Sequence, residues 1–151
     1  MQPKQSKNKV RALGLDLGTK RIGVAVSDSD GLLATPIEVV KRLGDISKEH
    51  LAIARLVKEW EIDVVVVGVP YSMDGSIGPM ARKAIAEAKK LGDTLSVSIE
   101  TYDERLTTVT AEQALREQGI KSKDGRKVVD QLAASILLQA WLDSRQNSED
   151  R

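Results

Sequence analysis

Residues 45–68 constrain the fold of this chain more than any other segment. Asp45 is suited to cap a helix over DISKEHLAIARLVKEW. The apolar residues of this segment fall on one helical stripe: Ile46, Ile53, Leu56, Val57 and Trp60. The helix leads directly into IDVVVVG, a nearly continuous apolar run that is typical of a strand buried on both faces of a parallel sheet. The segment therefore predicts a crossover helix within a β-α-β unit.

Three short β-rich runs precede this unit and predict an antiparallel meander. They are RALGLDLG (11–18), RIGVAVSD (21–28) and LLATPIEVV (32–40), and turns separate them. After the unit we expect a helix over 79–91 that stops at Gly92, then a strand in LSVSIETY, a helix over 108–118 and a last helix from about Arg126 to Ser144. This order predicts an α/β fold with a mixed five-stranded sheet and helices on both faces.

The length and composition limit both the domain count and the chemistry. The 151 residues suit one domain, which we place at residues 10–145 between flexible tails at 1–9 and 146–151. No apolar run is long enough for a membrane helix or a signal peptide, so we expect a cytoplasmic protein. The chain has no Cys and one His, His50, so catalysis would have to use carboxylates, Lys, Ser or Thr.

Three carboxylates occupy positions that suit a functional role. Asp16 lies in the first strand on the face of Gly14 and Gly18, and these glycines leave room for a ligand or a metal. Asp130 heads the buried stripe of the last helix, and Glu104 follows a parallel strand at the edge where α/β sheets bind ligands. Each acid also has a structural alternative. Asp16 could cap a turn, Asp130 could complement the helix dipole, and Glu104 could form a surface ion pair with Arg105.

Taken together, the three acids predict one divalent-metal site. Oxygen ligands favour Mg²⁺ or Mn²⁺, and two such ions about 4 Å apart can support phosphodiester cleavage. Basic residues beside the acids in the sequence would neutralise phosphates without reading base sequence: Lys20, Arg21, Arg105, Lys121, Lys123, Arg126 and Lys127. For the basic stretch 119–127, which we expect to be a loop, a solvated surface is the alternative.

Four segments resemble the YqgF family, also called RuvX, over about residues 11–145. They are GLDLGTKRIGVAVSD (14–28), VVGVPYSMDGS (66–76), YDERLTT (102–108) and DQLAASILLQAWL (130–142). The resemblance implies a ribonuclease H-like fold, with Asp16, Glu104 and Asp130 as the catalytic and metal-binding acids. It implies a function as a pre-16S rRNA nuclease or as a Holliday junction resolvase. The chain departs from the family pattern in lacking an aromatic residue in the 79–91 helix.

We expect a metal-dependent hydrolase that acts on nucleic acid, as a monomer or a weak homodimer. A ribosomal RNA precursor is preferred to branched DNA, because a junction resolvase needs a symmetric dimer and no segment indicates a dimer interface. Two alternatives stay open. GLDLGTKRIGVAV also resembles the phosphate motif of actin-like sugar kinases, although the chain holds only one such domain. A non-catalytic nucleic-acid-binding module is the other, although few aromatic residues are available for base stacking.

Five further residues near these motifs have subordinate predicted roles. We expect Asp28 and Asp103 to lie near the site and to support it or to be structural. Asp74 is expected in a turn at the rim of the cleft, and Thr107 and Thr108 are expected to cap the following helix or to contact phosphate.

Overall fold

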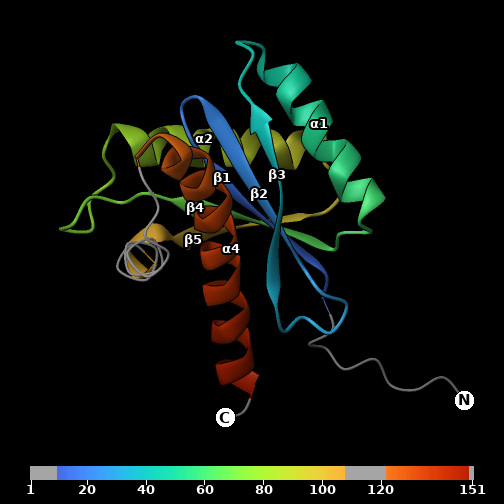
Figure 1. Ribbon diagram of the computed structural model, residues 1–151. Coiled ribbons are helices and arrows are strands. Elements are labelled where there is room, and N and C mark those ends of the chain that lie inside the picture. Colours follow the sequence, from blue (N-terminus) through green and yellow to red (C-terminus); the bar gives the residue numbers. More distant parts are fainter. Residues whose placement is uncertain (1–9, 108–121, 150–151) are drawn as a thin grey trace, which may run out of the picture.

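The sheet of this protein has five strands in the order β3-β2-β1-β4-β5 (Figure 1). The computed structural model describes residues 10–107 and 122–149, and gives side chains for residues 10–107 and 132–146. The strands are β1 (Ala12–Leu17), β2 (Arg21–Ser27), β3 (Ala34–Lys41), β4 (Val64–Val69) and β5 (Ser98–Asp103). The helices are α1 (Ile46–Glu59), α2 (Pro79–Thr94), the short 3-10 helix η1 (Glu104–Leu106) and α4 (Ser122–Glu149).

The strand pairing confirms the predicted meander and the predicted parallel unit. β1 pairs antiparallel with β2, and β2 pairs antiparallel with β3. On its other side β1 pairs parallel with β4, which pairs parallel with β5. The β1–β2 hairpin is closed by a tight turn in which the Gly18 amide donates to the Asp16 carbonyl at 3.1 Å. The sheet is therefore mixed, as the alternation of short strands and amphipathic helices predicts.

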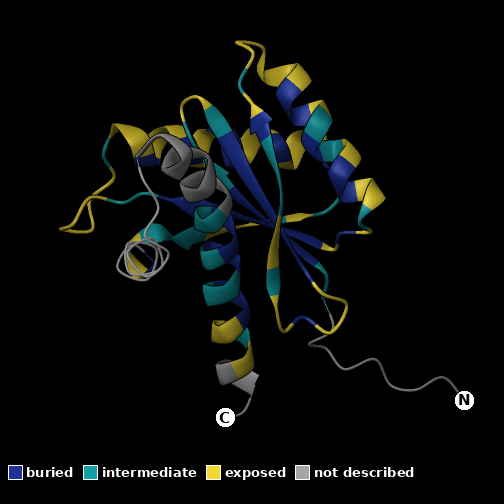
Figure 2. Ribbon diagram, in the orientation of Figure 1, coloured by how far each residue is buried: buried dark blue, intermediate teal, exposed yellow. Residues whose placement is uncertain are grey.

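Helices cover both faces of the sheet, as predicted. Leu13 and Leu15 are fully buried in the core beneath α1 and α2, whereas Gly14 between them faces α4. This alternation follows from the two-residue period of a strand. Figure 2 shows β1, β2 and β4 largely buried and the outer sides of α1 and α2 exposed. None of the helices in the described part of the chain is long and apolar enough to cross a membrane.

Asp45 caps α1 as predicted, and its carboxylate accepts hydrogen bonds from the amides of Ser47 at 3.1 Å and Lys48 at 3.3 Å.

The prediction that Gly92 ends the second helix is wrong. Gly92 lies inside α2, on its exposed side, and the helix ends after Thr94. A single solvent-facing glycine costs a helix only about 1 kcal/mol, which the burial of Leu91 beside it can offset.

The last helix is longer at both ends than predicted. α4 begins at Ser122 and ends at Glu149, so residues 122–127 are not a loop and residues 146–149 are not a tail. Charged and polar side chains are compatible with a helix where no neighbour requires an apolar face, so polarity alone does not mark a helix end. The predicted helix over 108–118 and the predicted tail over 1–9 lie outside the described residues.

Candidate active site

Two of the three predicted acids meet at one edge of the sheet. β1, β4 and β5 are parallel, and their carboxyl ends share this edge. Asp16 is the penultimate residue of β1, and Glu104 begins η1 directly after β5. Asp103 caps η1 by accepting a hydrogen bond from the Arg105 amide at 3.0 Å. The edge is where open α/β sheets place their ligand sites.

The carboxyl groups of Asp16 and Glu104, here called the acid pair, are joined by a side-chain hydrogen bond. Both residues are partly buried. Burial, reinforced by the negative charges of Asp16 and Asp103, raises the pKa of Glu104 to about 8. The acid pair therefore binds a proton more tightly than an isolated glutamate does.

Gly68 in β4 makes room for the acid pair. A Cβ atom at this position would lie 2.5 Å from Oε1 of Glu104, closer than real Cβ contacts come. The same Cβ would lie 3.0 Å from a methyl carbon of Leu137 in α4. Any side chain at Gly68 would push the Glu104 carboxyl or α4 away from the sheet. The sequence signal for Gly68 was its position in VVVVGV, where a glycine interrupts a buried strand.

The glycines beside Asp16 do not leave room for a ligand, contrary to prediction. A Cβ at Gly14 would lie 2.8 Å from Cβ of Leu138 and 3.1 Å from the Ala134 carbonyl oxygen, so α4 fills that space. A Cβ at Gly18 would lie 2.5 Å from the Arg21 carbonyl oxygen, because the hairpin turn is tight. These glycines allow close packing by the protein itself, which a strand pattern alone does not distinguish from space for a ligand.

The third predicted acid, Asp130, lies in α4, and its side chain is outside the described part of the structure. Ala134, Leu137 and Trp141 form a buried stripe on this helix, as predicted. Gln139, farther along α4, binds the β2–β3 turn, accepting from the Ala34 amide at 2.9 Å and donating to the Leu32 carbonyl at 2.8 Å. That turn lies at the opposite edge of the sheet, so the backbone at residue 130 lies toward the Asp16 edge.

Metal coordination needs more ligands than the acid pair supplies. Among the side chains that the structure describes, no group of three His, Cys, Asp or Glu is arranged to hold a metal ion. The acid pair offers carboxylate oxygens only, the donor type that Mg²⁺ and Mn²⁺ favour.

Two predicted basic residues lie in the β1–β2 hairpin, which follows Asp16 in the chain. Lys20 is exposed in the turn, and Arg21 begins β2. The predicted residues Lys123, Arg126 and Lys127 have their backbone in the first turns of α4, and their side chains are not described. Lys121 lies outside the described residues.

Arg105 pairs with Asp103 rather than with Glu104. Its Nη2 donates to Oδ2 of Asp103 at 2.6 Å, and its Nε donates to the same carboxylate at 3.0 Å. The guanidinium also lies over the ring of Tyr71, 5.8 Å from the centroid. The hydrogen bonds from Arg105 lower the pKa of Asp103, although slight burial opposes this. The alternative of a Glu104–Arg105 surface ion pair is therefore wrong, because Arg105 pairs with Asp103.

The subordinate residues have mainly structural contacts. Asp74 shapes a turn, as predicted, by accepting from the Ser76 amide at 2.9 Å. The Thr107 hydroxyl donates to the Glu104 carbonyl at 2.9 Å and so closes η1, whereas Thr108 lies outside the described residues. Asp28 is not near the site. It follows β2 at the opposite edge, where its carboxylate accepts from the Leu32 amide at 2.7 Å.

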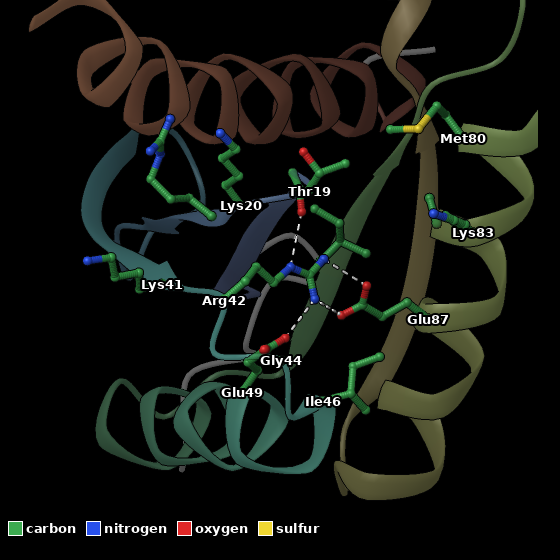
Figure 3. A pocket seen from close by; sticks show the side chains of 14 residues that line it. Thr19, Lys20, Lys41, Arg42, Gly44, Ile46, Glu49, Met80, Lys83 and Glu87 are labelled. Carbon is green, nitrogen blue, oxygen red and sulfur yellow. Dashed lines mark hydrogen bonds and ion pairs between the residues drawn. The ribbon is translucent and has the colours of Figure 1, made fainter. Parts of the chain in front are cut away.

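A second buried charged group was not predicted from the sequence. It consists of Arg42, Glu49, His50 and Glu87, and we call it the Arg42 cluster. Arg42 donates to Glu87 from Nη1 at 2.7 Å and from Nη2 at 2.9 Å, and to Glu49 from Nη1 at 2.9 Å (Figure 3). His50 Nε2 donates at 2.9 Å to Oε2 of Glu87, the oxygen that also accepts from Arg42 Nη1. The available signal was helical spacing, which places Glu87 on the apolar stripe of Ala84, Ala88 and Leu91.

The Arg42 cluster also fixes the hairpin that follows Asp16. The Arg42 amide donates to the Lys20 carbonyl at 2.9 Å, and Nε of Arg42 donates to the Gly18 carbonyl at 3.0 Å. Burial alone would raise the pKa of Glu87, but hydrogen bonds from Arg42 and His50 outweigh it and the pKa is lowered. The pKa of Glu49 is also lowered, because bonds from Arg42 and the Leu43 amide outweigh burial. Both carboxyls are therefore ionised and paired.

Comparison with known proteins gives matches over nearly the whole chain. The family model described as RuvX, Holliday junction resolvase, matches residues 10–144. A Crocosphaera subtropica protein named "Putative pre-16S rRNA nuclease" is 46% identical over 140 residues, which cover 93% of this chain and 97% of that protein. A Nocardia farcinica protein of the same name is 47% identical, covering 89% of this chain and 78% of its own length.

Among solved structures, T. thermophilus RuvC in complex with a Holliday junction substrate has the same fold. It is 17% identical, covers 91% of this chain and 96% of its own, and superposes with a TM-score of 0.53. At this identity the similarity establishes the ribonuclease H-like architecture, in agreement with the strand order described above.

Proposed function

The chain belongs to the RuvX family, and from that premise we propose that it is a divalent-metal-dependent nuclease that hydrolyses phosphodiester bonds in precursor 16S ribosomal RNA. The observation that carries the proposal is the contact between the Asp16 and Glu104 carboxyls at the carboxyl edge of three parallel strands. The choice of ribosomal RNA is supported by the name of relatives that match about nine-tenths of the chain.

The acid pair suits a divalent cation better than it suits a purely structural role. Two carboxyls held in contact oppose each other's ionisation, as the raised pKa of Glu104 records. A cation held between them would favour the ionised form of both. Mg²⁺ or Mn²⁺ bound by these oxygens would polarise the scissile phosphate and neutralise charge that develops in the transition state.

We assign Asp130 as the third acid of this site. Its backbone position, one helical turn before Ala134, lies on the α4 face that covers β1. α4 runs from the Asp16 edge toward the β2–β3 turn, so residue 130 belongs to the half of the helix nearer the acid pair. A site built from a strand, a post-strand turn and a helix depends on α4 packing correctly against the sheet.

The basic residues around the acids would hold the substrate backbone. Lys20 and Arg21 in the hairpin are assigned to substrate phosphates, and so are four residues that precede Asp130 in the sequence: Lys121, Lys123, Arg126 and Lys127. Arg105 is assigned the same role, although phosphate binding would compete with its pair to Asp103. Contacts of this kind give affinity without base specificity and are weakened by salt.

The test is cleavage of labelled precursor 16S RNA and of a four-way DNA junction by the whole protein, with Mg²⁺, Mn²⁺ or EDTA. We expect metal-dependent cutting of the RNA, and a fall in kcat of about 10³-fold or more in Asp16→Asn and Asp130→Asn. Cutting of the junction alone would instead identify a junction resolvase, which the description of the family model favours.

Asp28→Asn is the matched control, because Asp28 lies at the opposite edge and an asparagine oxygen can still accept from the Leu32 amide. It should cut like the wild type. Wild-type rates in Asp16→Asn, or full activity in EDTA, would refute the proposed site.

A further inference from the structure

A basic pocket lies at the same edge of the sheet as the acid pair, but on the opposite face. It has a volume of about 770 Å³ and lies between the β1–β2 hairpin, the end of β3, α1 and α2. Leu17 and the hairpin that follows it form one wall. Because consecutive strand residues point to opposite faces, Asp16 belongs to the α4 side and Leu17 to the pocket side. Only the end of β1 separates the pocket from the acid pair.

The charge of the pocket is positive at its mouth. Lys20 in the β1–β2 turn and Lys41 at the end of β3 lie on one side, with their ammonium groups pointing away from Arg42, and Lys83 of α2 lies on the other side (Figure 3). All three lysines are exposed, and among the described side chains none of their ammonium groups forms an ion pair. The two carboxylates of the pocket, Glu49 and Glu87, are held by Arg42 at its base and form no ion pair with the three lysines.

The pocket also offers apolar surface beneath these charges. Ile46 of α1 and Met80 of α2 line it, with 39% and 47% of their surface exposed, and Ala84 lies between Met80 and Glu87 along α2. Pockets of this size, with an apolar lining and a few polar groups, accept single small ligands rather than a helix or a duplex. Phosphate oxygens suit the lysines, and an unpaired base or a ribose suits the aliphatic side chains.

We propose that this pocket binds one unpaired nucleotide of a nucleic-acid strand, a few positions from the bond cut at the acid pair. The inference rests on the proposed nuclease function for its link to cleavage, but not for the binding itself. Lys41 and Lys83 hold the phosphate, while Ile46 and Met80 contact the sugar or the base. Because the apolar side chains offer no base-specific hydrogen bonds, the pocket binds nucleotides without reading their sequence.

The Arg42 cluster has a defined part in this arrangement. Arg42 binds the carbonyls of Gly18 and Lys20, and so fixes the hairpin wall shared by the pocket and the acid pair. It also pairs with Glu49 and Glu87, and its single positive charge offsets one of these two carboxylates, which would otherwise repel a phosphate. Arg42 is thus a positioning residue, because its own guanidinium is already occupied by acceptors of the protein.

The experiment measures binding by fluorescence anisotropy in EDTA, with a labelled single-stranded RNA, a duplex of the same length and the free nucleotide AMP as competitor. The double variant Lys41→Gln/Lys83→Gln is compared with Lys58→Gln/Lys89→Gln, which removes two exposed lysines of α1 and α2 that do not line the pocket. We expect the first variant to bind the single strand about tenfold more weakly, with a salt slope reduced by about 1, and the second to bind like the wild type.

Three results would overturn the inference. The first is that both double variants bind the single strand with equal affinity. The second is that Lys41→Gln/Lys83→Gln loses duplex binding as much as single-strand binding. The third is that AMP binding depends on Lys41 and Lys83 while strand binding does not. The last would identify a free nucleotide as the ligand.

Failure of the proposed function is a separate result, because the binding assay contains no metal and needs no cleavage. A wild-type protein that binds through the lysines but cuts nothing would leave the pocket assigned and refute the nuclease.

A second measurement locates the ligand independently of the variants. In ¹H–¹⁵N NMR spectra, addition of the unlabelled single strand should shift the amide signals of Thr19, Arg42 and Lys83. If the strand changed the signals of other amides but not of these three, it would bind elsewhere and the proposal would be contradicted.

Discussion

The acid pair and the Arg42 cluster lie at the same end of β1 on opposite faces of the sheet, and they treat buried carboxyls in opposite ways. In the Arg42 cluster a guanidinium and an imidazole donate to Glu49 and Glu87, and the pKa values of both acids are lowered. In the acid pair the groups that act on Glu104 are burial and two other acids, and the pKa is raised. The direction of the pKa shift, more than burial, separates a carboxyl that is already satisfied from one that a bound cation would stabilise.

The largest effect is expected when the Arg42 cluster loses its cation. Arg42→Met leaves Glu49 and Glu87 buried without the guanidinium, and should lower the free energy of unfolding by about 3–5 kcal/mol. Urea denaturation at pH 7 measures the loss. Arg55→Met, at an exposed position of α1, should change it by less than about 0.5 kcal/mol. Equal effects of the two substitutions would show that the cluster contributes no more than a surface charge.

Removing one carboxyl from the acid pair and one from the Arg42 cluster should change the free energy of unfolding in opposite directions. At pH 8 without divalent metal, Glu104→Gln should raise the free energy of unfolding by about 1–2 kcal/mol, because an amide can still donate to Asp16 without a second negative charge. Glu87→Gln should lower it by about 2–3 kcal/mol, because Arg42 and His50 lose an ionised partner. Denaturation of both variants in parallel gives the signs, and destabilisation by Glu104→Gln would break the contrast.

The acid pair should also make stability depend on pH. The pKa of Glu104 is about 8 in the folded protein and near 4.5 in an unfolded chain, so the protonated form favours folding. Its contribution is complete below about pH 4.5 and is lost as the pH rises toward 8. The wild type should therefore lose stability relative to Glu104→Gln over this range. Melting curves at several pH values test this, and parallel curves would contradict it.

Divalent metal supplies a further check on the same titration. Mg²⁺ should raise the melting temperature of the wild type more at pH 8 than at pH 5, because the cation competes with the proton for the acid pair. Glu104→Gln should show little of this gain. An equal gain in both proteins would mean that the ion binds elsewhere.

The smallest expected effect compares two glycines. Gly92→Ala places its Cβ 3.6 Å from the nearest side-chain atom, within ordinary contact, and should stabilise α2 by about 0.5–1 kcal/mol. Gly68→Ala forces a Cβ against the Glu104 carboxyl and should instead lower stability and reduce the Mg²⁺-dependent shift in melting temperature. Stabilisation by both substitutions would show that Glu104 can move aside freely.

The strand order and the meeting of Asp16 with Glu104 were predictable because they depend on local patterns. Alternating residues assign Leu13 and Asp16 to opposite faces, and parallel strands bring their carboxyl ends to one edge. The Arg42 cluster was not predictable in the same way, because Arg42 and Glu87 are 45 residues apart and neither carries a motif. Asp28 was placed near the site by proximity in sequence, whereas the antiparallel register of β1 and β2 carries it to the far edge.

The close packing of α4 against Gly14 and Gly68 has a consequence for biosynthesis. Every strand of the sheet precedes α4 in the chain, and domains fold from the N-terminal side while the ribosome adds about 5–20 residues per second. A nascent chain that has completed β5 and η1 contains Asp16 and Glu104, but the sheet face that carries them still lacks the α4 residues that pack against it. It lacks residue 130 until the final helix is made. In the proposed site, the three acids can therefore come together only after nearly the whole chain has been made.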